Sequence, residues 1–70
     1  MTFKNITAGQ SFRVLTRFYS DVVLTAKADV QEDPFTVAMY GREPMKVLCT
    51  NESGEEFYHL ASADTPIQYV

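Results

Sequence analysis

Apolar and polar residues alternate along residues 11–19, which gives the clearest periodic pattern in the chain. One set of alternate positions is apolar except for a threonine: Phe12, Val14, Thr16 and Phe18. The other set combines two arginines with a leucine and a tyrosine: Arg13, Leu15, Arg17 and Tyr19. A period of two residues is typical of a β-strand with one buried face. We therefore predict a strand over residues 11–19 whose first set of side chains faces the core.

A hairpin is predicted for residues 45–60. Two runs rich in β-branched and aromatic residues, 45–50 and 55–60, flank a polar segment that ends in Gly54. A glycine at this place can adopt the left-handed conformation that closes the loop of a hairpin. Ser53 and Glu56 also fit a capping box, which would begin a helix instead. The hairpin is favoured because Gly54 would fall in the first helical position, and Phe, Tyr and His are poor helix formers.

The apolar residues in 22–30 fit the pattern of a strand and also that of a helix. A strand would place five apolar residues on one face: Val22, Leu24, Ala26, Ala28 and Val30. A helix capped by Ser20 would form an apolar stripe from valines and an alanine, but the β-branched residues favour the strand. Residues 35–40 and 67–70 also have strand character, and the second of these is expected to pair near the N-terminal segment. Turns and loops are expected at residues 7–10, 31–34, 41–44 and 61–66.

About five strands at a spacing of roughly 8–12 residues indicate a small barrel or sandwich. The predicted fold is mainly β, a single domain over residues 1–70 that forms a small antiparallel five-stranded barrel or bent sheet. Its layout is similar to that of small SH3-like barrels, a likeness of architecture that transfers no functional residues because such folds host many functions. The alternative is an α+β fold in which residues 21–31 are helical.

The size of the chain limits how it can be stabilised. A chain of 70 residues buries only about 60% of its unfolded surface, which leaves little net stability. One cysteine, Cys49, allows no internal disulfide, and with the single histidine, His59, it provides too few N and S ligands for a zinc site. We therefore expect no metal and no cofactor. Oligomerisation, or packing on a partner, is the stabilising route that the composition leaves open.

Charge and hydropathy narrow the classes of partner. Nine acidic against six basic residues give a net charge of −3. This balance argues against duplex nucleic acid, which is bound through clustered Lys and Arg. No run approaches the roughly 20 apolar residues of a membrane span, and the N-terminus does not resemble a signal peptide. A cytoplasmic protein without a membrane partner is the resulting expectation.

Cys49 and His59 are the one pair of residues that suggests catalysis. A thiolate beside an imidazolium is a nucleophile that enzymes use. A three-residue hairpin loop would place both side chains on one face of the hairpin, whereas a four-residue loop would separate them. No third orienting group and no oxyanion donor can be identified. We therefore expect that the protein is not an enzyme, with a Cys/His thiol enzyme as the weakest alternative.

The mixed face of residues 13–19 is the best candidate for binding, because Arg and Tyr dominate the hot spots of protein interfaces. The predicted binding residues are Arg13, Leu15, Arg17, Tyr19, Tyr40, Lys46 and Tyr58. An ordinary exposed sheet face, with Arg stems covering apolar surface, is the competing interpretation. The leading functional hypothesis is a small acidic, non-catalytic protein-binding module: an accessory or inhibitory protein that occupies a partner's surface. Because phages and other mobile elements often encode short, cysteine-poor chains, anti-defence inhibition is a sub-hypothesis. The alternative is a single-stranded nucleic-acid-binding barrel that uses the same Arg and aromatic residues.

Overall fold

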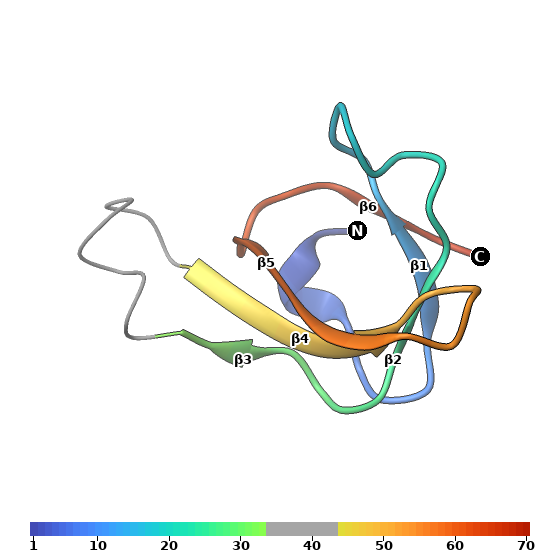
Figure 1. The fold of residues 1–70 in the computed structure, drawn as a ribbon. Coiled ribbons are helices and arrows are strands. Elements are labelled where there is room, and N and C mark those ends of the chain that lie inside the picture. Colours follow the sequence, from blue (N-terminus) through green and yellow to red (C-terminus); the bar gives the residue numbers. More distant parts are fainter. Residues whose placement is uncertain (34–43) are drawn as a thin grey trace.

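Six antiparallel strands form one sheet that curls around the core in the computed structural model, which describes residues 1–33 and 44–70 (Figure 1). The strands are β1 (Ser11–Val14), β2 (Leu24–Ala26), β3 (Gln31–Glu32), β4 (Pro44–Thr50), β5 (Glu56–Ser62) and β6 (Ile67–Tyr69). A short 3-10 helix, η1 (Phe3–Asn5), precedes them. The predicted mainly β class is therefore confirmed. The helical alternative for residues 21–31 is wrong, since β2 lies within that segment and β3 begins at its last residue.

The sheet is bent but does not close into a barrel. Its strand order is β3-β4-β2-β1-β6, and β5 pairs with β4. Residues of the N-terminal segment lie beside the last strand, where the Ile67 N–H donates to the Met1 carbonyl at 3.1 Å and the Tyr69 hydroxyl donates to the Asn5 carbonyl at 3.0 Å. The expected pairing of the C-terminal strand near the N-terminal segment is thus confirmed, and β6 also pairs with β1.

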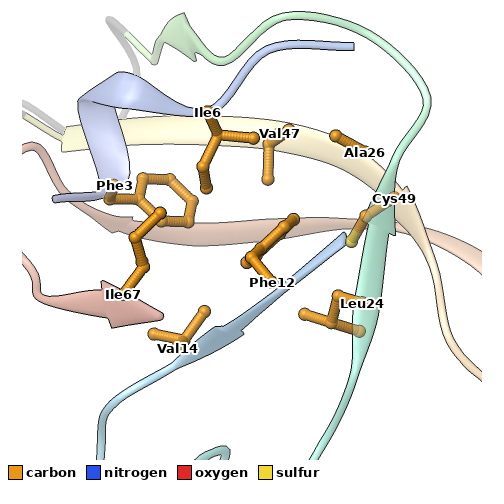
Figure 2. Packing of buried hydrophobic residues seen from close by; sticks show 9 residues of the cluster. All are labelled: Phe3, Ile6, Phe12, Val14, Leu24, Ala26, Val47, Cys49 and Ile67. Atoms are coloured by element: carbon orange, nitrogen blue, oxygen red, sulfur yellow. The ribbon is translucent and has the colours of Figure 1, made fainter. Parts of the chain in front are cut away.

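One apolar core fills the concave side of the sheet (Figure 2). Its buried members come from four strands and from the N-terminal segment: Phe3, Ile6, Phe12, Val14, Leu24, Ala26, Val47, Cys49 and Ile67. Phe3 and Ile6 lie outside the strands and are nevertheless among the largest fully buried side chains. The N-terminal segment therefore acts as part of the core.

The hairpin of β4 and β5 confirms the prediction for residues 45–60. Seven residue pairs run from Pro44 opposite Ser62 to Thr50 opposite Glu56. The Asn51 N–H donates to the Glu55 carbonyl at 3.1 Å, which leaves a three-residue loop, and Gly54 has a φ of +82°. This positive φ is the left-handed conformation that glycine adopts without steric cost. The helical alternative at this place is wrong.

The strand predicted for residues 11–19 is shorter than expected, because β1 ends at Val14. The Leu15 N–H still donates to the Pro66 carbonyl at 3.0 Å, but Pro66 has no N–H to return and the partner chain turns away there. The Thr16 N–H then donates to the Val14 carbonyl at 2.8 Å, so the chain leaves the sheet. Of the four residues predicted to face the core, two are buried and two, Thr16 and Phe18, are exposed.

Two other segments differ from the prediction. The strand expected over residues 22–30 is limited to β2, and the loop expected at 31–34 contains β3, which pairs with β4. Residues 27–30 leave the sheet, and the Asp29 carboxylate there accepts a hydrogen bond of 2.9 Å from the Ala8 N–H. The turn at residues 7–10 is confirmed by the Gln10 N–H donating to the Thr7 carbonyl at 3.2 Å. The strand predicted at 35–40 lies outside the described residues.

Candidate binding surface

The predicted binding residues fall on three places in the structure and do not form one strand face. Arg13 is half-buried on β1, whereas Leu15, Arg17 and Tyr19 lie in exposed turns that follow it. Lys46 and Tyr58 lie on the neighbouring strands β4 and β5. Tyr40 lies outside the described residues. The prediction that alternate residues of 13–19 form one face of a strand is therefore wrong. The alternation in the sequence continues to residue 19, but β1 ends at Val14.

Exposed apolar side chains gather in residues 15–19, which we call the 15–19 loop. Leu15, Phe18 and Tyr19 are all exposed, and Phe18 presents 81% of its surface to solvent. The loop has internal order, since the Tyr19 N–H donates to the Thr16 carbonyl at 3.3 Å and the Val22 N–H donates to the Tyr19 carbonyl at 3.0 Å. The Arg17 guanidinium lies 5.9 Å from the centre of the Phe18 ring, within the range of a cation–π contact.

Tyr19 connects this loop to the body of the protein. Its ring meets the ring of His59 edge-on, with centroids 4.7 Å apart and an interplanar angle of 87°. The His59 ring in turn lies 5.9 Å from the ring of Phe3 in η1. The edge-to-face geometry of the Tyr19–His59 pair is stabilising beyond the area that the two rings bury. The loop, β5 and the N-terminal segment are therefore joined by three rings.

Lys46 and Tyr58 belong to a second exposed group on the outer face of the β4–β5 hairpin. Tyr58 is opposite Leu48, and Leu60 is opposite Lys46. The Lys46 ammonium lies 5.1 Å from the centre of the Tyr58 ring. Tyr58 and Leu60 are 49% and 50% exposed. This face therefore combines one cation with two half-exposed apolar side chains.

Cys49 and His59 share the inner face of the hairpin, as a three-residue loop requires. The strand register pairs Val47 with His59 and Cys49 with Phe57. The Cys49 thiol is fully buried and donates to the Phe57 carbonyl, with 3.5 Å between the two atoms. Burial raises the pKa of the Cys49 thiol and lowers the pKa of His59. Both shifts favour the neutral forms, whereas an activated nucleophile needs a thiolate and an imidazolium.

Arg13 shows the competing, purely structural role of an arginine on this sheet. Its Nε atom is buried and has no hydrogen-bond partner among residues 1–33 and 44–70. A half-buried arginine of this kind covers apolar surface with its stem. Arg13 therefore contributes less to an exposed binding surface than Arg17 does.

The pH dependence of stability follows from His59. Burial holds the pKa of His59 below the ordinary value of 6.5. When the pH is lowered, the imidazole of the unfolded chain therefore takes up a proton at a higher pH than the imidazole of the folded protein does. The contribution of His59 to stability is full above about pH 6.5 and is lost as the pH falls through the folded pKa, with a slope of at most about 1.4 kcal/mol per pH unit. Urea unfolding at several pH values between 7.5 and 5 measures this loss of stability. The slope is expected to disappear in His59→Gln, and an equal slope in both proteins would contradict the prediction.

No group of three or more His, Cys, Asp or Glu side chains that could hold a metal ion occurs in the described part of the chain. In that same part, no helix is long and apolar enough to cross a membrane. Comparisons of the chain with protein-family models, with curated proteins and with solved structures gave no match.

Proposed function

We propose that this protein is a non-catalytic protein-binding module whose principal contact surface is the 15–19 loop. The observation that carries the proposal is the exposure of Phe18, which is 81% accessible beside Arg17, Leu15 and Tyr19. An exposed phenylalanine ring buries little area in the free protein, where its one recorded contact within the described residues is with Arg17. Aromatic residues and arginine are enriched in the centres of protein interfaces, where they bury a large area against a partner.

The chemistry of the loop suggests the kind of protein surface that it fits. Phe18 and Leu15 would enter an apolar depression, and the Arg17 guanidinium beside them would meet a carboxylate at its rim. Tyr19 holds the loop against His59, so part of the ordering cost of binding is already met in the free protein. A protein of this size would act by occupying its partner's surface, as an accessory or inhibitory protein does. Inhibition of a defence system by a phage-encoded protein is one instance of that proposal.

Recovery of a partner from a lysate of the source organism tests the proposal. The variant Arg17→Ala/Phe18→Ala is expected to lose the protein that the wild type recovers, with an affinity at least about tenfold weaker. The matched control is Lys27→Ala/Val70→Ala, which removes a cation and an apolar side chain that are also exposed. The control should recover the partner as the wild type does. If the loop variant recovers as much of the partner as the wild type does, the 15–19 loop is not the contact surface.

Single-stranded nucleic acid is a second candidate ligand. Two cation–aromatic pairs favour it, Arg17 with Phe18 and the partly exposed Lys46 with Tyr58, because bases stack on aromatic rings while cations meet phosphates. The net charge of −3 opposes it. Fluorescence anisotropy with labelled oligonucleotides at about 50 mM salt, where electrostatic binding is strong, decides between the two candidates. An absence of binding there would eliminate nucleic acid.

A further inference from the structure

β5 is an edge strand, because β4 is its one strand neighbour within residues 1–33 and 44–70. This edge is long, since β5 has seven residues, whereas β3 has two and β6 has three. Residues 57–62 contain no proline, lysine, arginine or carboxylate, and seven consecutive pairs with β4 leave no bulge in the strand. Charges, prolines and bulges are the usual protection of edges, so an edge without them can accept another strand.

The register identifies which backbone groups of β5 face the free edge. In an antiparallel pair, alternate residues exchange hydrogen bonds with the neighbouring strand. The hairpin loop closes with the Asn51 N–H donating to the Glu55 carbonyl at 3.1 Å. The residues of β5 that are bonded to β4 are therefore the odd-numbered ones, Phe57, His59 and Ala61. The N–H and carbonyl groups of Tyr58 and Leu60 point away from β4, and no other backbone hydrogen bond reaches them in the part of the chain that the structure describes.

The side chains along this edge are acidic at the beginning of β5 and apolar in its middle. Three exposed glutamates lie at the beginning: Glu52, Glu55 and Glu56. No ion pair joins any of them to another described residue. Tyr58 and Leu60 are 49% and 50% exposed on the outer face. The Lys46 ammonium lies 5.1 Å from the centre of the Tyr58 ring, in the middle of the strand. The edge therefore has an acidic end beside an apolar centre.

These charges do not suit a second copy of the chain. Two copies of β5 paired antiparallel around His59 would place Glu56 of each across from Ser62 of the other. That end carries a further carboxylate, since Asp64 accepts a hydrogen bond of 2.8 Å from the Ser62 hydroxyl. Parallel pairing would place the glutamates of the two copies together, which is destabilising. In neither arrangement does β5 provide a lysine or an arginine, whereas a basic segment of another protein would provide one.

We propose that β5 binds an extended basic segment of another protein as an added antiparallel strand. The segment has an apolar residue across from Leu60, a second one across from Tyr58, and a lysine or arginine across from Glu56. It is antiparallel because such pairs are slightly more stable per residue than parallel ones. Backbone hydrogen bonds give such a contact its affinity, and alternate side chains give it specificity. The inference does not rest on the proposed function, since no residue that carries it belongs to the 15–19 loop.

Fluorescence anisotropy tests the proposal with two labelled peptides that differ only in charge. The first, Thr-Val-Thr-Val-Thr-Lys-Lys, has the proposed pattern, and its lysines would lie across from Glu56 and Glu55. We expect it to bind with a dissociation constant of about 10–500 μM at low salt, as a contact of this small size does. The second peptide has glutamate in place of both lysines, and it should bind at least about tenfold more weakly.

The variant Glu55→Lys/Glu56→Lys reverses the charge of the acidic end and should reverse the preference between the two peptides. Both side chains are exposed, so we expect the variant to fold as the wild type does. The matched control is Asp21→Lys/Glu32→Lys, which makes the same change of net charge at two exposed residues outside β5. The control should keep the preference for the lysine peptide. A variant and a control with the same preference would contradict the proposed position of the cation.

The amide resonances of the wild-type protein report where the peptide binds. Those of Tyr58 and Leu60 should move downfield the most, because their N–H groups gain hydrogen bonds, whereas Phe57 and His59 are already bonded to β4. The proposal is overturned if the lysine peptide does not bind at up to about 1 mM, if the glutamate peptide binds equally well, or if the largest shifts lie outside β5. It is also overturned if the Tyr58 and Leu60 resonances move with protein concentration alone, since a second copy would then occupy the edge.

Discussion

Replacement of Phe12 by alanine is expected to destabilise the protein by about 3–5 kcal/mol. Phe12 is fully buried and is one of the two largest side chains in the core (Figure 2). Alanine would leave a cavity that β1 cannot fill by moving, since this strand is held on both sides by β2 and β6. A domain of 70 residues has a total stability of roughly 4–10 kcal/mol. The substitution should therefore remove from about a third to all of that stability.

Phe18→Ala is the matched control, because it makes the same substitution six positions along the same predicted strand. Phe18 is exposed, so its replacement should change the free energy of unfolding by no more than about 0.5 kcal/mol. Urea titrations followed by circular dichroism measure both variants. Similar losses of stability in the two variants would mean that β1 continues beyond Val14 and that Phe18 is part of the core.

The hairpin of β4 and β5 could be predicted from the sequence because its signals are local. Apolar runs on both sides of a polar segment indicated the strands, and Gly54 indicated the turn. Both features act over a few residues, and the structure has both. The choice between a three- and a four-residue loop stayed open, because local signals fit either. Packing decides it, since the three-residue loop places His59 on the same inner face as Val47 and Cys49, where it is buried.

The end of β1 could not be predicted, because a strand ends where its partners end. Residues 15–19 keep the alternation of residues 11–14, but β6 and β2 provide no pairing for them. The position at which those strands begin depends on distant residues such as Pro66 and Leu24. Alternation therefore identified Phe12 and Val14 correctly as core residues and assigned Phe18 wrongly.

The candidate site was predictable in composition but not in geometry. Leu15, Arg17 and Tyr19 were selected as residues of a strand face, and the structure places them in a loop. Phe18 was missed, because the same alternation assigned it to the core. The contact between Tyr19 and His59 joins residues 40 positions apart, and no local pattern reports a contact over that separation. Lys46 and Tyr58 are near each other because the hairpin register brings them together.

A second large effect is expected at Phe3, which precedes every strand. Its side chain is fully buried, and its ring also contacts His59 at 5.9 Å. Phe3→Ala should destabilise the protein by about 3–5 kcal/mol, as a central core residue does. It should also remove one neighbour of His59, the ring against which Tyr19 packs, so the 15–19 loop should become less ordered. Urea unfolding measures the first effect, and amide exchange at Tyr19 and Val22 measures the second.

Lys4→Ala is the control for Phe3→Ala, since Lys4 is the next residue in η1 and is exposed. Its replacement leaves the backbone hydrogen bond from the Lys4 N–H to the Ala63 carbonyl in place, so stability should change by no more than about 0.5 kcal/mol. If both variants are as stable as the wild type, the N-terminal segment is only an attachment to the sheet. If Phe3→Ala alone unfolds, the aromatic ring of η1 closes the core at the place where β5 and β6 do not pair with each other. The stability of this open, six-stranded sheet would then depend on a segment outside the sheet.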